Sequence, residues 1–228
     1  MSIFSKLKEK KEATLAKKYI NHVQHSLANA EHNISKLNAE LLLMPGMTGK
    51  KTRHFYNNLL SMEHCNYLEI GTWQGSSFCS ALYKNKINAT SIDNWSEFQG
   101  PKNEFLQNLK KYTGENKVKF IESDCWDVNP KKLSKFNVYL YDGPHNYDDQ
   151  YKALKHFLPC LKNTFIFIVD DWNWDYVRNG TFDAIRDLKL NVAWQHEIRL
   201  THDNSHTPEP LSIETWWNGL YVAVLQKP

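Results

Sequence analysis

Short runs of β-branched and aromatic residues alternate with helix-forming stretches from residue 66 to the end of the chain. The runs predict five strands, at residues 66–70, 90–92, 118–121, 138–141 and 165–169. The stretches between them predict helices at residues 76–83, 103–112, 130–133 and 148–158. Such alternation indicates right-handed βαβ units in a parallel sheet. After another predicted helix at residues 182–188, runs at residues 192–200 and 220–225 have no helix between them. We therefore expect a doubly wound, mostly parallel α/β sheet of seven strands, closed by an antiparallel hairpin.

Heptads of apolar residues precede this alternating region. Apolar side chains occupy position a at Ala13, Ile20, Leu27, Ile34 and Leu41, and position d at Ala16, Val23, Ala30, Leu37 and Met44. This pattern predicts one helix over about residues 13–44, ended by Pro45-Gly46, and a short helix follows near residues 54–61. Its narrow apolar stripe could pack against the chain's own domain or pair with a second copy in a homodimer, and both remain open. We expect an N-terminal helical extension over residues 1–64 and a globular domain over residues 65–228.

Carboxylates follow two of the predicted strands at the point where each strand ends. The strand at residues 138–141 runs into Asp142, and the strand at residues 165–169 runs into Asp170 and Asp171. Ligands of open α/β sheets bind at these carboxyl ends, so the three acids are expected to converge in one crevice. Like charges held that close repel one another unless a cation or a proton lies between them. The pattern therefore predicts a site for Mg²⁺ or another hard divalent cation.

The first predicted strand ends in a glycine turn, Gly71-Thr72-Trp73-Gln74-Gly75, followed by serines that can cap a helix. The G-x-x-x-G spacing differs from the G-x-G-x-x-G dinucleotide fingerprint, which speaks against a nicotinamide dehydrogenase. Acids also close the second and third strands, at Asp93 and Asp124. An acid after the second strand is placed to bind two ribose hydroxyls.

Composition narrows the class of protein. The 228 residues, 41% hydrophobic and 13% aromatic, suit one folded α/β domain with an extension. A net charge of +3 is too balanced to imply a nucleic-acid partner. The four cysteines form no C-x-x-C pair, so no zinc knuckle is indicated. No apolar run reaches membrane-spanning length, and the lysine-rich start lacks an apolar signal segment, so we expect a soluble, cytoplasmic protein.

The motifs together resemble a known family. Over about residues 66–226 the chain is similar to the Rossmann-like S-adenosylmethionine-dependent methyltransferases, and among them to the divalent-metal O-methyltransferases of the catechol and macrolide-sugar types. Residues 69–77 (EIGTWQGSS), residues 142–147 (DGPHNY) and Asp170-Asp171 carry the resemblance. It implies a cofactor whose methionine part lies near Glu69, Gly71 and Gly75, whose ribose is held by Asp93, and whose adenine lies beside Asp124 with Cys125 or Trp126. Thr72, Ser76 and Asp142 complete the expected cofactor site, and Asp142, Asp170 and Asp171 match the family's metal ligands.

One departure from the catechol-type pattern concerns the general base. Those enzymes carry D-x-x-K-x-x-Y after the fourth strand, whereas this chain has His145 three residues after Asp142 and its tyrosine one place early, at Tyr147. An imidazole can accept a proton near neutral pH, so we expect His145 to be the base, with Asp142 also contributing to catalysis. The alternative is a turn histidine that bonds the backbone.

The acceptor is the least defined part of this interpretation. The long polar and aromatic segment over residues 201–217 is expected to overhang the strand ends as a substrate lid. Trp172 and Trp174 could form a platform for a sugar ring, or they could belong to the core. A platform would favour a carbohydrate-like small molecule as the acceptor. Other acceptors on the same fold are a catechol-like phenol, a protein or a nucleic acid. The non-enzyme alternative is a binding protein that oligomerises through its heptad helix.

Overall fold

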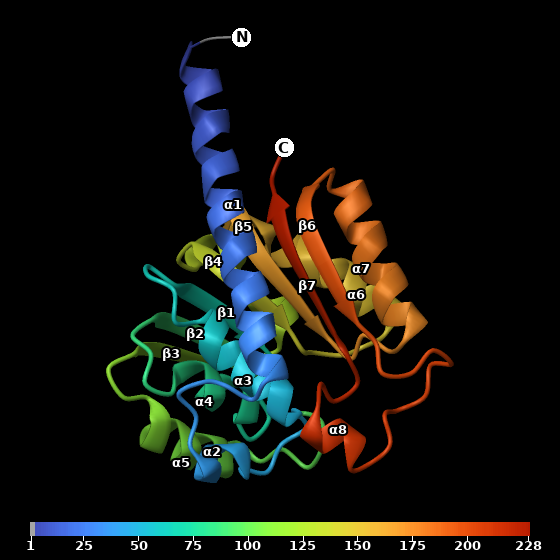
Figure 1. Cartoon of the computed structure of the whole chain (residues 1–228). Helices are drawn as coiled ribbons and strands as arrows, with labels where there is room; N and C mark the ends of the chain where they lie inside the picture. Colours follow the sequence, from blue (N-terminus) through green and yellow to red (C-terminus); the bar gives the residue numbers. More distant parts are fainter. Residues whose placement is uncertain (1–2) are drawn as a thin grey trace.

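The computed structural model describes residues 3–228, which fold around one seven-stranded sheet (Figure 1). The strands lie in the order β3-β2-β1-β4-β5-β7-β6. Strands β1 to β5 run parallel, and β7 lies antiparallel between β5 and β6. Their bounds are β1 Asn66–Ile70, β2 Asn88–Asp93, β3 Lys117–Glu122, β4 Phe136–Tyr141, β5 Leu161–Asp170, β6 Asn191–Ile198 and β7 Leu220–Gln226. This arrangement confirms the predicted doubly wound sheet with a closing antiparallel pair.

Helices cover both faces of the sheet. Their bounds are α1 Ile3–Glu31, α2 Ala39–Leu42, α3 Lys50–Leu59, α4 Ser76–Leu82, α5 Lys102–Tyr112, α6 Tyr147–Phe157, α7 Asp175–Asp187 and α8 Leu211–Glu214. Short 3₁₀ turns occupy Cys125–Asp127, Pro130–Lys132 and Leu158–Cys160. In Figure 1, α1 and α3 lie in front of the sheet, and α6 and α7 lie behind it.

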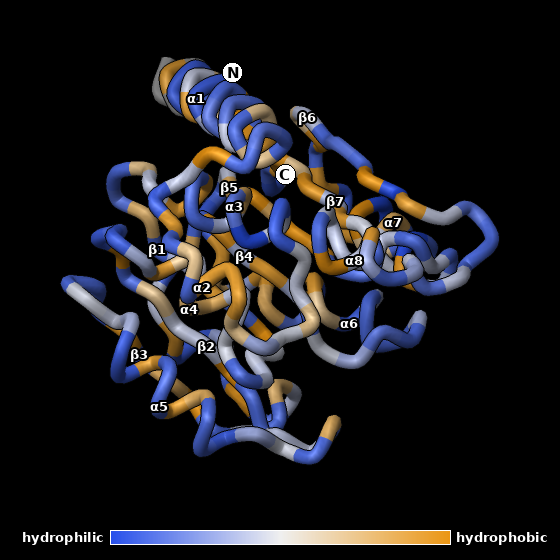
Figure 2. Tube along the Cα trace, turned by 60° about the horizontal axis from the view of Figure 1, so that its bottom comes forward, coloured by the Kyte–Doolittle hydropathy of each residue, from blue (hydrophilic) through white to orange (hydrophobic). Residues whose placement is uncertain are grey.

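The strand residues alternate between two cores because successive side chains of a strand point to opposite faces. On β4, Val138 and Leu140 pack with buried residues of α1, α3 and α4. Tyr139 and Tyr141 of the same strand pack with buried residues of α6 and α7. Figure 2 shows the corresponding distribution, with hydrophobic positions along the central strands and hydrophilic positions on the surrounding loops. A sheet buried on both faces leaves the strand ends as the place for a ligand site.

The N-terminal helix is shorter than the heptads predict. Helix α1 ends at Glu31, and Asn33 has a left-handed backbone (φ 55°), so the prediction of a helix continuing to residue 44 is wrong. The later apolar heptad residues have another role, since Leu41 and Met44 form a small core with Cys79 and Tyr112.

Helix α1 packs against its own chain. The d-position residues Ala16, Val23 and Ala30 are buried in the core beside α3, whereas the a-position residue Ala13 is exposed. Although α1 is 29 residues long, no helix of the described chain has the length and apolar character of a membrane span. Pairing of α1 with a second copy stays a prediction.

Candidate active site

The carboxyl ends of β1, β2, β4 and β5 border a cavity of about 290 Å³. Strand β1 lies between β2 and β4, and the chain adds strands on one side of β1 first and on the other side afterwards. The strand order therefore reverses next to β1, which is where open α/β sheets bind ligands. The cavity wall includes most of the predicted site residues: Gly71, Thr72, Ser76, Asp93, Asp124, Cys125, Trp126, Asp142, His145, Asp170 and Asp171. Glu69 and Gly75 are not in the wall. The structure therefore brings the glycine turn and the acids into one site.

Gly71 lies directly against the end of β4. Its φ of +82° is a left-handed conformation, and a Cβ at this position would lie 1.9 Å from the carbonyl oxygen of Asp142. The backbone N–H of Asp142 in turn donates to the carbonyl of Ile70 at 2.9 Å. Only glycine tolerates both the backbone angle and this contact. The turn after β1 and the first acid after β4 are thus fixed relative to each other.

Asp93 holds the glycine turn in place. Its Oδ2 accepts hydrogen bonds from the backbone N–H groups of Thr72 (2.7 Å) and Trp73 (2.9 Å) and from the Thr72 hydroxyl, and its Oδ1 accepts from the N–H of Trp95 at 2.7 Å. These bonds use most of the acceptor capacity of a carboxylate. A ribose hydroxyl at Asp93 would share Oδ1 or displace the Thr72 hydroxyl.

The segment after β3 contributes another part of the cavity wall. Asp124 caps a 3₁₀ turn by accepting from the backbone N–H of Trp126 at 2.9 Å. Cys125 is buried, and burial raises the pKa of its thiol to about 12. The Trp126 ring lies 6.4 Å from the Tyr141 ring, between centroids. This wall presents a neutral thiol and an aromatic ring, which suit a flat base.

Glu69 lies behind the turn, inside the sheet. It is fully buried and accepts hydrogen bonds from the hydroxyls of Ser77 and Tyr67, each at 2.5 Å. Burial raises the pKa of this carboxyl to about 8, although the two hydroxyl donors lower it in part. The side chain supports α4 and β1, so it could act on a cofactor only through the residues around it.

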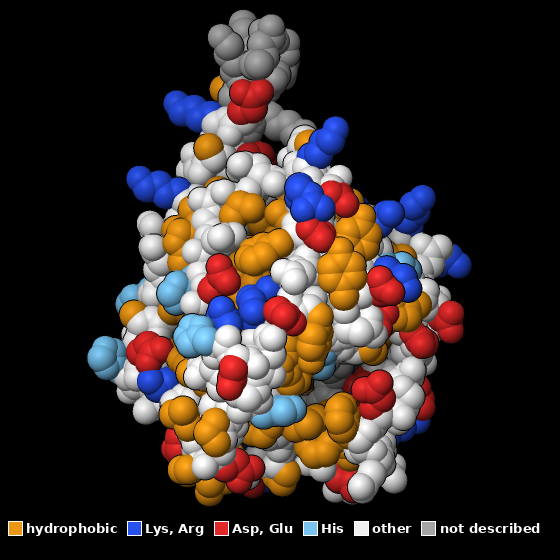
Figure 3. Space-filling model, turned by 90° about the vertical axis from the view of Figure 1, so that its right-hand side faces the viewer, with side chains coloured by type: hydrophobic (Ala, Val, Ile, Leu, Met, Phe, Trp, Pro, Cys, Tyr) orange, Lys and Arg blue, Asp and Glu red, His pale blue; other side chains and the backbone are white. Residues whose placement is uncertain are grey.

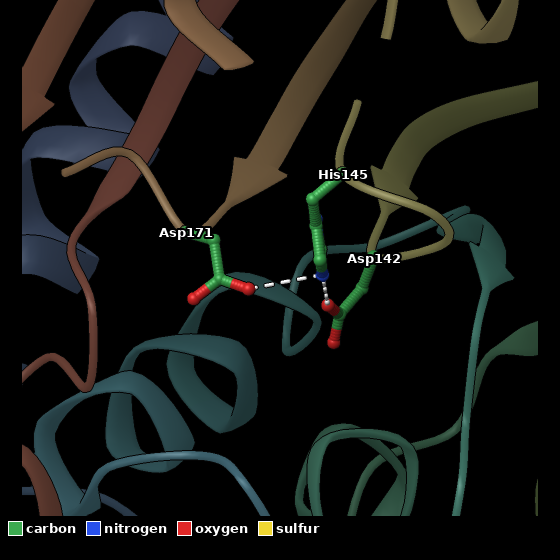
Figure 4. A group of neighbouring side chains, drawn as sticks. All are labelled: Asp142, His145 and Asp171. Atoms are coloured by element: carbon green, nitrogen blue, oxygen red, sulfur yellow. Dashed lines mark ion pairs between the residues drawn. The ribbon is translucent and has the colours of Figure 1, made fainter. Parts of the chain in front are cut away.

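Asp142, His145 and Asp171 meet at the other end of the cavity (Figure 4). His145 Nε2 lies 2.9 Å from Asp171 Oδ2 and 3.7 Å from Asp142 Oδ1. The imidazole therefore points between two carboxylates that come from different strands. Burial and the neighbouring carboxylates of Asp170 and Asp171 raise the pKa of the Asp142 carboxyl well above its ordinary value.

Asp170 is buried beside this cluster but is not part of it. Its Oδ1 has no hydrogen-bond partner among the described residues. Burial, followed by the charge of Asp171, raises the pKa of the Asp170 carboxyl well above its ordinary value. A buried carboxylate oxygen without a donor is costly unless a cation or proton reaches it. The residues present thus fit a divalent cation, which would supply the missing charge.

Two further segments reach the cavity: a loop before α3, which the strand-end pattern did not indicate, and the segment between β6 and β7, which was expected to overhang the strand ends. Met47 and Thr48 line it because the buried guanidinium of Arg53 donates to the carbonyls of Leu41, Met44 and Thr48 and so folds this loop inward. The Arg53 guanidinium therefore binds backbone carbonyls, although its positive charge could have suggested an anion site. No periodicity in the sequence marks such a contact.

The segment between β6 and β7 forms the remaining wall through His206, Trp217 and Asn218. Trp174, in the loop before α7, also lines the cavity and contacts the edges of the His145 and His206 rings. Trp172 does not, because it is fully buried and stacks on Tyr221 at 4.3 Å. Both tryptophans considered for a platform belong to the buried core, and Trp174 also lines the cavity. Figure 3 shows this side of the molecule, where hydrophobic, acidic and histidine side chains border a hollow.

Comparison with known proteins finds one family that part of the chain resembles. Residues 68–172, which span the glycine turn and all the acids, match the family model described as a methyltransferase domain. This part of the chain is thus similar to a methyltransferase domain. A search of curated protein sequences finds no match.

Solved structures share the fold of this chain at low sequence identity. SMU.776, described as a methyltransferase candidate complexed with SAH, superposes with a TM-score of 0.54 at 11% identity, over 80% of this chain and 50% of that one. TrmN from Thermus thermophilus superposes with a TM-score of 0.53 at 12% identity, over 83% of this chain and 52% of that one. The chain thus spans about half the length of these two. The O-methyltransferase from Bacillus cereus in complex with SAH superposes with a TM-score of 0.54 at 11% identity, over 90% of this chain and 91% of that one. These likenesses establish a Rossmann-like methyltransferase fold.

Proposed function

We propose that the protein is an S-adenosylmethionine-dependent, metal-assisted O-methyltransferase that acts on a hydroxyl of a small, carbohydrate-like molecule. One observation carries the proposal: the glycine turn and the acid cluster border the same cavity and touch at Gly71 and Asp142. A methyl donor bound at the turn would have its sulfonium near an acceptor bound at the acids. Holding both reactants in line supplies much of the rate of a displacement reaction.

The donor half would consist of Gly71, Thr72 and Ser76 around the methionine part, with Asp93 at the ribose. Asp124, Cys125 and Trp126 would border the adenine. Support comes from their common place in the cavity wall and from the SAH complexes of the structural neighbours SMU.776 and the Bacillus cereus enzyme. Glu69 would contribute through Ser77, which lines the cavity and donates to its carboxylate.

The acceptor half would hold Mg²⁺ or another hard divalent cation with Asp142, Asp170 and Asp171. The raised pKa values of Asp142 and Asp170 and the unpartnered Oδ1 of Asp170 support this assignment. When bound, the cation would orient the acceptor hydroxyl and lower its pKa. The carboxylates also exclude an anionic group from this end of the cavity.

His145 would take the proton of the acceptor hydroxyl. Its ring is oriented by the 2.9 Å contact with Asp171 and by the edge of Trp174, at 5.7 Å between ring centroids. In the transfer, the bond from the methyl carbon to sulfur breaks as the bond to the acceptor oxygen forms. The hydroxyl proton would pass to Nε2 of the imidazole, which for this step must carry its own proton on the buried Nδ1 and give up its contact with Asp171 Oδ2. No covalent intermediate with the protein is needed.

The carbohydrate-like acceptor is favoured by the cavity wall beside the acid cluster. Trp174 and Trp217 present aromatic surface beside polar groups of His206 and Asn218, a combination that suits an oxygen-rich ring. A cytoplasmic location and a homodimer through α1 stay predictions from the sequence.

The test is a methyl-transfer assay with radiolabelled S-adenosylmethionine and a panel of methyl glycosides, with catechol as a phenolic comparison. We expect label in a glycoside, loss of transfer with EDTA, and recovery when Mg²⁺ is added. Full activity in EDTA would overturn the metal role, and transfer to catechol alone would overturn the carbohydrate acceptor.

A further inference from the structure

The Asn218 side chain connects the β6–β7 segment to the acid cluster. It is buried, with 3% of its surface exposed, and it follows Trp217 at the edge of the cavity. Its Oδ1 accepts the backbone N–H of Thr207 at 2.9 Å, and its Nδ2 donates to Asp171 Oδ1 at 2.8 Å. The same Nδ2 lies 3.3 Å from Nδ1 of His206. Segments more than forty residues apart in sequence thus meet at one amide.

These contacts fix which way the amide points. A backbone N–H can only donate, so the atom facing Thr207 must be the carbonyl oxygen of Asn218. The NH₂ group then faces Asp171 and His206, and it has two N–H bonds, one for each. An N–H needs a lone pair opposite it, so His206 Nδ1 must be unprotonated. A neutral His206 therefore carries its proton on Nε2.

The remaining edge of His206 is available to a ligand. The residue is exposed and lines the cavity, and its ring meets the Trp174 ring nearly at a right angle, with centroids 5.0 Å apart. Nε2 has no hydrogen-bond partner among the described residues. The Trp174 ring contacts both His206 and His145, so a ligand oxygen at Nε2 of His206 would belong to a part of the ligand close to the reacting hydroxyl.

We propose that Asn218 is a positioning residue that holds His206 in its Nε2–H tautomer, and that His206 donates this hydrogen bond to a second oxygen of the acceptor. The recognition part rests on the proposed function and deepens it. It specifies an acceptor with an oxygen adjacent to the methylated hydroxyl, as on a sugar ring. The positioning part rests only on the contacts of Asn218.

The positioning part is tested by nitrogen NMR on protein labelled with ¹⁵N-histidine, at a pH where His206 is neutral. Two-bond ¹H–¹⁵N correlations report which ring nitrogen carries the proton, and the His206→Gln variant assigns the signal. We expect the Nε2–H pattern in the wild type, a mixture of tautomers in Asn218→Ala, and protonated Nδ1 in Asn218→Asp. Thr201→Val is the matched control, because it removes only a hydrogen bond to the Ser205 carbonyl within the same segment. It should keep the wild-type pattern.

An Nδ1–H pattern in the wild type, or an unchanged pattern in Asn218→Ala, would overturn the positioning role. If Asn218→Asp does not fold, the Asn218→Ala spectrum decides. The measurement needs no methyl donor, metal or acceptor, so it stands or fails separately from the proposed function.

The recognition part is tested with the methyl glycoside that the transfer assay turns over. His206→Phe should raise the KM for that glycoside about tenfold, the value of one hydrogen bond, with a smaller change in kcat. His206→Gln keeps an N–H donor and should recover part of the loss. An unchanged KM in His206→Phe, with methyl transfer intact, would refute recognition by His206 and leave the proposed function standing.

Discussion

Gly71 and Asp142 are in direct backbone contact, so close that a Cβ on Gly71 would lie 1.9 Å from the Asp142 carbonyl oxygen. This contact ties the turn after β1 to the acid after β4. The proposed donor and acceptor halves of the site therefore cannot shift independently. A methyl-transfer reaction needs such fixed geometry, because small misplacements of the reacting atoms cost large factors in rate.

The Gly71→Ala variant should be strongly destabilised. The added Cβ meets backbone atoms that cannot rotate away, and the φ of +82° adds strain of about 1–2 kcal/mol. Gly114→Ala is the matched control, since Gly114 also has a positive φ (+52°) but nothing lies within 4 Å of its Cβ position. Urea unfolding should show a loss of more than ~3 kcal/mol for Gly71→Ala and only the strain cost for Gly114→Ala. Equal losses would mean that the contact with Asp142 is unimportant.

Glu69→Gln should change the pH dependence of stability. The pKa of Glu69 is about 8 in the folded protein and near 4.5 in an ordinary environment. Between these pH values the unfolded chain has released the proton and the folded chain keeps it, so wild-type stability falls as pH rises through this window. Glutamine carries no such proton, so the stability of the variant relative to the wild type should increase from pH 5 to pH 8. The increase in the free energy of unfolding should be on the order of a few kcal/mol. Denaturant titrations at several pH values measure this, and a constant difference between the proteins would contradict it.

Asp170→Asn should stabilise the metal-free protein and weaken its response to Mg²⁺. The substitution removes one of the mutually repelling buried carboxylates, but it also removes a proposed ligand. In the wild type, Mg²⁺ at about 100 times its Kd should stabilise the fold by ~2.7 kcal/mol, or roughly 5–10 °C in Tm. Asp175→Asn, at an exposed position on α7, is the control and should keep the full response. A wild-type Tm that does not respond to Mg²⁺ would contradict the metal site.

His145→Gln should lower the methyl-transfer rate about 10²- to 10⁴-fold, as expected for loss of a general base. If His145 is the base, the Kd for Mg²⁺ should change little in this variant and should rise sharply in Asp171→Asn. Calorimetric titration with Mg²⁺ compares the two. A Kd that rises equally in both variants would make the imidazole a metal ligand, which the 2.9 Å and 3.7 Å contacts also allow.

Much of the fold could be predicted from hydrophobic periodicity. The predicted strand at residues 138–141 lies within β4, and the paired runs at the end of the chain form β6 and β7. The end of α1 could not be predicted, because Leu41 and Met44 continue the heptad for a different reason, their packing against Cys79 and Tyr112. A periodic pattern records which residues are buried, not which element buries them.

The site was partly predictable for a similar reason. Asp142, Asp170 and Asp171 lie at or directly after strand ends, which marks them in the sequence. Asn218 carries no such mark, and its importance arises only where the chain folds back on Asp171. The burial of Glu69 also depends on tertiary packing. The motif alone therefore could not predict that Glu69 does not line the cavity.

The most direct test of the account is isothermal titration calorimetry of the purified protein with S-adenosylhomocysteine, in the presence of Mg²⁺ and with NAD⁺ as the comparison ligand. We predict saturable binding of one S-adenosylhomocysteine per chain and no binding of NAD⁺. Absence of S-adenosylhomocysteine binding by the folded protein, or binding of NAD⁺ in its place, would contradict it.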